Sequence, residues 1–191
     1  MDKRDLEQLL SDVADGAVAP AVALTRIQTA PTADLGFAQL DLSRGVRQGA
    51  GEVVYGAGKT AEQIAAIIEA LHDAGQERIL VTRLDAEKAA RTSELLDNGI
   101  DLGYVPDAQL ALVGGKPSPT GNGRIVVACA GTSDLPVAEE AALTAEFYGN
   151  EVDRLYDVGV AGLHRLLAHA EELARAQVVI AIAGMEGALA S

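Results

Sequence analysis

The N-terminal part of the chain begins with apolar residues at helical spacing. Four residues predict the first helix: Leu6, Leu9, Leu10 and Val13. Gly16 is expected to end that helix, and a second short helix is expected to begin near Pro20. We expect the two helices to form an arm that packs on another subunit or domain.

Apolar and amphipathic stretches alternate through the middle of the chain. Strands are expected at 52–55 and 78–82, and the capping-box pair Thr60 and Gln63 predicts the start of a helix between them. Four apolar residues form the buried face of that helix: Ile64, Ile67, Ile68 and Leu71. A further helix and two short strands follow: 85–97, 102–105 and 110–113. This alternation predicts an α/β unit.

The segment 114–123, GGKPSPTGNG, interrupts the pattern with four glycines and two prolines, as is typical of a linker. We therefore divide the chain into a helical arm with a small α/β domain (1–113), the linker, and a partial C-terminal domain (124–191). In the C-terminal part, strands and helices alternate: 125–130, 135–148, 151–157, 160–175 and 177–183. These strands are continuously apolar, which predicts an α/β fold with a doubly wound parallel sheet covered on both faces.

Composition limits the classes of function. An apolar fraction of 49% in 191 residues indicates a globular chain with a sizeable core. A single cysteine excludes an internal disulfide framework, and neither a leader nor a bilayer-spanning run is seen, so we expect a cytoplasmic protein. The net charge of −13 disfavours nucleic acid and anionic membranes as partners. A phosphorylated small ligand is compatible with this charge if local donors hold it.

Each of the three C-terminal strands is followed by a polar or glycine-rich loop. The loops are GTSD (131–134), DVGVAG (157–162) and GMEG (184–187). Because ligands bind outside the carboxyl ends of parallel strands, we expect the loops to meet at one edge of the sheet and form a site. Gly131, Thr132 and Ser133 would offer N–H groups and hydroxyls to an anion at a helix start. Asp134 either caps that helix or belongs to the site.

Further candidates lie in and beside these loops. His164 can move a proton near neutral pH, and Arg165 follows it. Glu186 is a candidate general base if burial raises its pKa. The remaining loop candidates would contact the substrate: Asp157, Gly159, Gly184 and Met185.

Other residues invite chemical interpretations that the pattern supports less. Cys129 lies within an apolar strand, where a free cysteine behaves as a small hydrophobe. The run YGAGKT (55–60) lacks the first glycine of a phosphate-binding loop, because Val53 stands there. Candidate anion contacts outside the three loops are basic residues: Arg44, Arg47, Lys59 and Arg83. No cluster of Cys and His has metal-ligand spacing, so structural zinc is not expected.

Four longer motifs resemble one family: VVYGAGKTAEQI, AGTSDLPVAEEA, DVGVAGLHRLL and AGMEGAL. They resemble the carboxylase/hydrolase of nickel-pincer nucleotide cofactor biosynthesis, the LarB family, over nearly the whole chain. The C-terminal half also resembles the PurE-type aminoimidazole ribonucleotide carboxylases and mutases. The resemblance implies a flavodoxin- or PurE-like fold for the C-terminal part, incomplete in this sequence.

The resemblance also implies a reaction. Nicotinic acid adenine dinucleotide would be carboxylated on its pyridinium ring with CO2 or bicarbonate, and its phosphoanhydride would be hydrolysed to release AMP. In the family a thiolate adds to the ring so that the ring can attack CO2. The resemblance implies that Glu186 is the base near the ring, that His164 moves a proton, and that Ser133 and Asp134 hold the ribose and phosphate. Lys59, Arg44 and Arg47 would reach the adenylate side.

This sequence departs from the family pattern. The family continues beyond GMEGAL with further sheet units and its nucleophilic cysteine, whereas this sequence ends at Ser191, so we expect a truncated member. The alternatives are a PurE-like carboxylase or a silent nucleotide-binding subunit. Mg²⁺ is a plausible helper at the phosphoanhydride. Strand 177–183 would be an apolar edge, which predicts a homo-oligomer.

Overall fold

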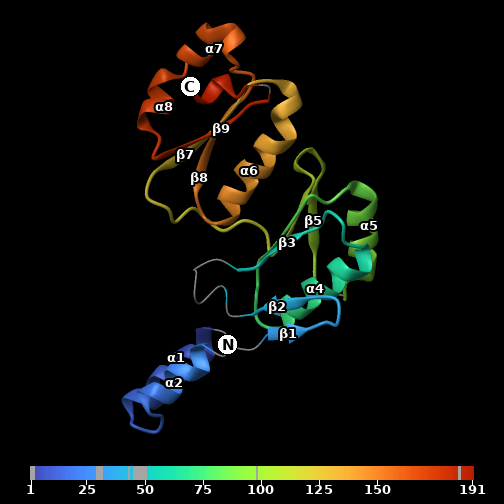
Figure 1. Cartoon of the computed structure of the whole chain (residues 1–191), viewed down its shortest axis with the longest axis vertical. Coiled ribbons are helices and arrows are strands. Elements are labelled where there is room, and N and C mark those ends of the chain that lie inside the picture. Colours follow the sequence, from blue (N-terminus) through green and yellow to red (C-terminus); the bar gives the residue numbers. More distant parts are fainter. Residues whose placement is uncertain (1–2, 29–31, 43, 45–50, 98, 185) are drawn as a thin grey trace.

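The computed structural model describes residues 3–28, 32–42, 44, 51–97, 99–184 and 186–191. Helices α1 (Lys3–Ala14) and α2 (Pro20–Gln28) form the predicted arm. Leu9 and Ala23 are buried between them, and Gly16 ends α1 with a φ of 72°, which glycine adopts without strain. Figure 1 shows this helical arm at the end of the molecule remote from α7 and α8.

A mixed four-stranded sheet forms the middle of the molecule. Its order is β3 (Val53–Tyr55), β4 (Ile79–Thr82), β6 (Leu110–Val113), β5 (Leu102–Val105), with only the β3–β4 pair parallel. Helices α4 (Ala61–Asp73) and α5 (Ala86–Leu95) bury their apolar faces against it. The predicted capping box is confirmed, because Thr60 accepts from the Gln63 N–H while Gln63 accepts from the Thr60 N–H.

A small antiparallel hairpin, which the sequence pattern did not reveal, packs on the same core. It consists of β1 (Thr32–Asp34) and β2 (Gln39–Asp41). Leu40 is buried in the cluster around Ile64 and Ile68. Strands of this length carry too few residues to show a period of two.

The C-terminal part is a parallel sheet covered on both faces. Its order is β8 (Glu151–Leu155), β7 (Arg124–Cys129), β9 (Val178–Ile182). Helix α6 (Leu135–Phe147) packs on the face that presents Val127 and Cys129. Helices α7 (Leu163–Leu167) and α8 (Ala170–Arg175) cover the opposite face. This is the doubly wound α/β arrangement of flavodoxin- and PurE-like folds.

The prediction of one continuous helix over 160–175 is wrong. The segment 160–175 is a short 3₁₀ turn (Val160–Gly162), then α7, then α8. At the break the His169 N–H donates to Leu166 O, and the His169 ring contacts the Glu172 carboxylate at the start of α8. Leu166 and Leu173 still pack on the same apolar cluster, so the apolar spacing alone concealed the turn.

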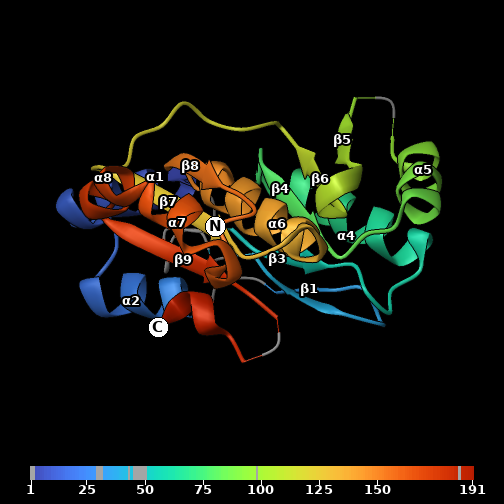
Figure 2. The same ribbon diagram turned by 90° about the horizontal axis from the view of Figure 1, so that it is seen from above.

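Helix α6 contributes to both sheets. Its Leu143 and Phe147 lie in a cluster with Leu80 and Leu112 of the mixed sheet, while Ala138 packs on the parallel one. The segment 114–123 contains no helix or strand. Figure 2 shows it as a yellow arc from β6 to β7 along the outside of the molecule. The division into domains stays a prediction, but the two sheets share α6.

Candidate functional site

The three predicted loops meet at the carboxyl edge of the parallel sheet, around the end of β7. The Ala130 N–H donates to Ile182 O at 3.0 Å, which joins the end of β9 to β7. The Gly159 N–H donates to Ala130 O at 3.0 Å, which joins the segment after β8 to the end of β7. We call the described residues of these loops (131–134, 157–162, 184 and 186–187) the rim. The strand order reverses between β7 and β9, and such a switch point is where open α/β sheets bind ligands.

The first loop of the rim is a 3₁₀ turn (Thr132–Asp134) that leads directly into α6. The Asp134 carboxylate accepts from the Gly131 N–H at 3.1 Å, so it closes the turn and does not cap α6. Thr132 and Ser133 are exposed. The turn is therefore fixed from within while its hydroxyls face solvent at the start of a thirteen-residue helix.

The second loop leaves β8 through a strained residue. Asp157 has a φ of 57°, and its carboxylate pairs with the Arg165 guanidinium. Gly159 is buried, and a Cβ there would lie 2.7 Å from Ala130 O, so the close approach requires glycine. The guanidinium also lies over Gly162, where a Cβ would stand 2.5 Å from Arg165 Nε. These close approaches hold Arg165 beside the rim.

The third loop lies next to the first. A Cβ on Gly184 would stand 3.8 Å from Asp134 Oδ1, so the backbone of one loop approaches the carboxylate of the other. Glu186 and His164 are both exposed. Met185 lies outside the described residues. The burial expected for Glu186 is therefore not found, but both side chains are available to a ligand, and their roles stay predictions.

The basic candidates outside the rim lie elsewhere. Lys59 is in the loop after β3 of the mixed sheet, where its Nζ donates to Tyr55 O at 3.0 Å. Lys88 reaches the same loop, with Nζ 3.3 Å from Gly56 O. Arg44 is exposed, and Arg47 lies outside the described residues. Arg83 pairs with Glu140 of α6.

Cys129 is not accessible enough to act as a nucleophile. It is fully buried on β7, and its thiol donates to Gly131 O over 3.7 Å. Burial raises the pKa of the thiol, and the nearby carboxylate of Asp134 adds to the effect. A protonated thiol beneath the rim is unreactive, as expected for a small core residue.

The sequence analysis missed a group of charged side chains between α6 and β8. Arg154 contacts both Glu139 and Glu146 of α6, and Tyr156 donates to Glu139 at 2.7 Å. Although Glu139 is charged and lies in the first part of α6, its side chain is three-quarters covered. The alternation of Val152, Arg154 and Tyr156 along β8 was the available signal, because it places all three on one face.

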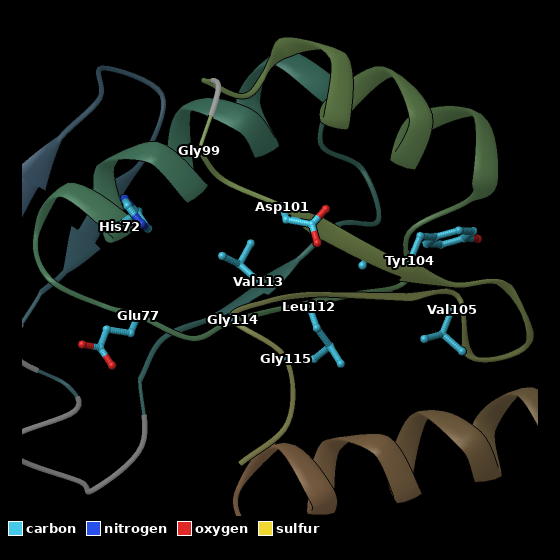
Figure 3. A pocket seen from close by; sticks show the side chains of 11 residues that line it. His72, Glu77, Gly99, Asp101, Tyr104, Val105, Leu112, Val113, Gly114 and Gly115 are labelled. Carbon is cyan, nitrogen blue, oxygen red and sulfur yellow. The ribbon is translucent and has the colours of Figure 1, made fainter.

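Two hollows lie away from the rim. One, of about 480 Å³, borders β5 and β6 and is lined by glycine backbone together with His72, Glu77 and Asp101. Figure 3 shows that these three side chains come from separate segments around the hollow. The other, of about 410 Å³, runs between α6 and Ile180 of β9.

In the ranges described, no three or more His, Cys, Asp and Glu side chains gather as a metal site would require. None of the described helices combines the length and apolar character of a bilayer crossing.

Comparisons with known proteins agree with this architecture. Residues 32–114, which contain the hairpin and the mixed sheet, match the LarB/PurE-like N-terminal domain. An uncharacterized protein of Methanocaldococcus jannaschii is 35% identical over 157 residues, which cover 80% of this chain and 61% of the relative. The chain therefore spans less than two thirds of the relative's length. The match identifies residues 32–114 as a LarB/PurE-like N-terminal domain, and this domain relates the chain to the LarB family of carboxylases.

Proposed function

We propose that the chain binds nicotinic acid adenine dinucleotide at the rim, carboxylates its pyridinium ring and hydrolyses its phosphoanhydride. The products would be the pyridinium biscarboxylic acid mononucleotide and AMP, for synthesis of a nickel-pincer cofactor. The match of residues 32–114 to the LarB/PurE-like N-terminal domain supports the reaction class. The observation that carries the proposal is the meeting of three polar loops where the strand order reverses.

The first loop and Arg165 supply what a phosphate requires. The start of α6 carries the positive end of the helix dipole, next to the exposed hydroxyls of Thr132 and Ser133. Arg165 adds a cation that a phosphate can take over from Asp157. These local donors allow a protein with a net charge of −13 to hold an anionic ligand.

The carboxylation has a defined electron balance. A cationic ring does not attack CO2, so a thiolate must first add to it and form a dihydropyridine. The ring carbon then forms a bond to CO2, a base removes the proton from that carbon, and the thiolate leaves with its electron pair. We assign the base to Glu186, proton movement to His164, and positioning of the ribose to Asp134. Cys129 is too deeply buried to be the thiolate. Any Mg²⁺ would arrive bound to the phosphoanhydride.

Mass spectrometry of the products tests the proposal. The protein is incubated with the dinucleotide and bicarbonate, with and without 2-mercaptoethanol as a substitute nucleophile and with and without Mg²⁺. Formation of both AMP and the doubly carboxylated ring supports the proposal. Binding without turnover in every mixture indicates a silent nucleotide-binding subunit instead. Turnover of aminoimidazole ribonucleotide alone indicates a PurE-like carboxylase.

Glu186→Gln tests the assigned base. The amide cannot take the ring proton, so carboxylation should be lost while dinucleotide affinity stays within about tenfold. Calorimetric titration measures the affinity, and the product assay measures turnover. Carboxylation at the parent rate would remove Glu186 from this role.

A further inference from the structure

Five side chains form a continuous polar connection between the segment 114–123, helix α6 and strand β8. We call it the α6–β8 polar chain, and its members are Lys116, Glu146, Arg154, Glu139 and Tyr156. Lys116 Nζ lies 2.7 Å from Glu146 Oε2, and Arg154 Nη1 contacts the other oxygen of Glu146. Arg154 Nε lies 3.3 Å from Glu139 Oε2. The Tyr156 hydroxyl completes the chain at Glu139 Oε1.

The α6–β8 polar chain is largely shielded from water, and its charges balance. The side chains of Arg154, Glu139 and Glu146 are 27%, 24% and 18% exposed, and two carboxylates face two cations. Charges withdrawn from water are tolerated only when each is paired, and removing one partner leaves the other charge uncompensated. Hydrogen bonding to Glu146 raises the pKa of Arg154. Burial, and then the bond to Glu139, raises the pKa of Tyr156, so the phenol remains a donor at neutral pH.

The polar chain ends where the rim begins. Tyr156 directly precedes Asp157, the left-handed residue, and the next two N–H groups, of Val158 and Gly159, donate to the end of β7. Glu139 lies in α6 shortly after the first loop of the rim. The bond between Tyr156 and Glu139 therefore joins the exit of β8 to the helix that carries the loop of Thr132 and Ser133.

From this connection we infer that Tyr156 and Glu139 are positioning residues for substrate binding at the rim. They hold the loop 157–162, and with it Arg165, at a fixed place relative to the start of α6. The inference rests on the proposed function for the identity of the substrate. Its structural part, the anchoring of the loop, stands independently of the reaction.

Tyr156→Phe tests the inference, since it keeps the ring and removes only the hydroxyl. Loss of one hydrogen bond should raise KM for the dinucleotide about three- to tenfold with little change in kcat. Hydrogen exchange of the Val158 and Gly159 amides should accelerate by a similar factor. Tyr148→Phe is the matched control, because Tyr148 is 40% exposed and contacts Phe147 edge to face. It should change neither quantity.

Substitutions of Glu139 separate positioning from simple loss of stability. Glu139→Gln keeps an oxygen that can accept from Tyr156, so its KM should lie closer to the parent value than that of Glu139→Leu. Unchanged amide exchange in Tyr156→Phe would overturn the inference whatever the activity. If the parent protein neither binds nor converts the dinucleotide, the proposed function fails, and the exchange measurement still decides the anchoring.

Discussion

The two sheets use the same local construction, a strand followed by a polar loop and a helix, for different purposes. In the mixed sheet, the loop after β3 is occupied by its own neighbours, since Lys59 and Lys88 donate to its carbonyl oxygens. In the parallel sheet, Thr132, Ser133, His164 and Glu186 are exposed around a backbone that is fixed from below. Loop composition alone therefore does not distinguish a stabilising turn from a binding site; the distinction lies in which polar groups are already engaged.

The two sheets also differ in how deeply their strands are buried. Every residue of β4 and β6 is buried, whereas the residues of β9 are all exposed or half-buried. The mixed sheet thus has a fully buried centre, whereas the parallel sheet is buried along most of β7 and leaves its edge strand β9 open. Four changes test this contrast.

The largest effect is expected in the mixed sheet. Leu80 is fully buried in the cluster that joins this sheet to α6. Leu80→Ala should lower the free energy of unfolding by about 2–5 kcal/mol, from lost burial and the cavity left behind. Urea denaturation measures the change. Leu24→Ala, at a 56% exposed position of the arm, is the control and should cost under about 0.5 kcal/mol. Similar losses at both positions would contradict the contrast.

A smaller loss is expected at the rim. Gly159→Ala places a methyl group 2.7 Å from Ala130 O, so the loop must move, at a cost of about 1–3 kcal/mol. Gly131→Ala is the matched variant, because its Cβ would have no neighbour nearer than 3.9 Å. Thermal unfolding should separate the two variants clearly. Equal melting temperatures would show that the loops do not meet as tightly as described.

Self-association tests the open edge of β9. Val179 is 46% exposed on a strand that lacks Lys, Pro and other protecting residues, so we propose that β9 pairs with a second copy of the chain. Val179→Lys should shift the protein toward monomer in light scattering. If Leu10→Lys on the arm has this effect and Val179→Lys does not, the arm is the interface. A strictly monomeric parent would exclude both.

The smallest effect concerns acid stability. Burial alone would raise the pKa of Glu146, but bonds from Arg154 and Lys116 outweigh it, so the pKa is lowered on folding. A carboxyl whose pKa is lowered stabilises the fold above its unfolded pKa of about 4.3, and this contribution disappears as pH falls through the folded value. Glu146→Gln should therefore reduce the gap in urea midpoint between pH 7 and pH 3. An unchanged gap would argue against the ion pairs.

Local patterns predicted those elements whose causes are local. The Thr60 capping box and the strands 102–105 and 110–113 were predicted at the observed bounds, because side-chain period and cap chemistry act within a few residues. The break at His169 and the hairpin around Leu40 depend on packing between distant segments, which no local window contains. At the rim, strand topology predicted the convergence of the loops. It did not predict that Asp134 bonds to Gly131, or that Arg154 withdraws Glu139 from the surface.

The shared helix α6 has a consequence for folding. Because one helix completes the interior of both sheets, the mixed sheet cannot bury Leu80 and Leu112 fully before α6 has docked, and α6 leaves Leu143 and Phe147 uncovered until it does. Cleavage within the outer arc would interrupt the polypeptide, yet the two fragments would remain associated through that common interior. The chain should therefore lose its native structure in one cooperative transition.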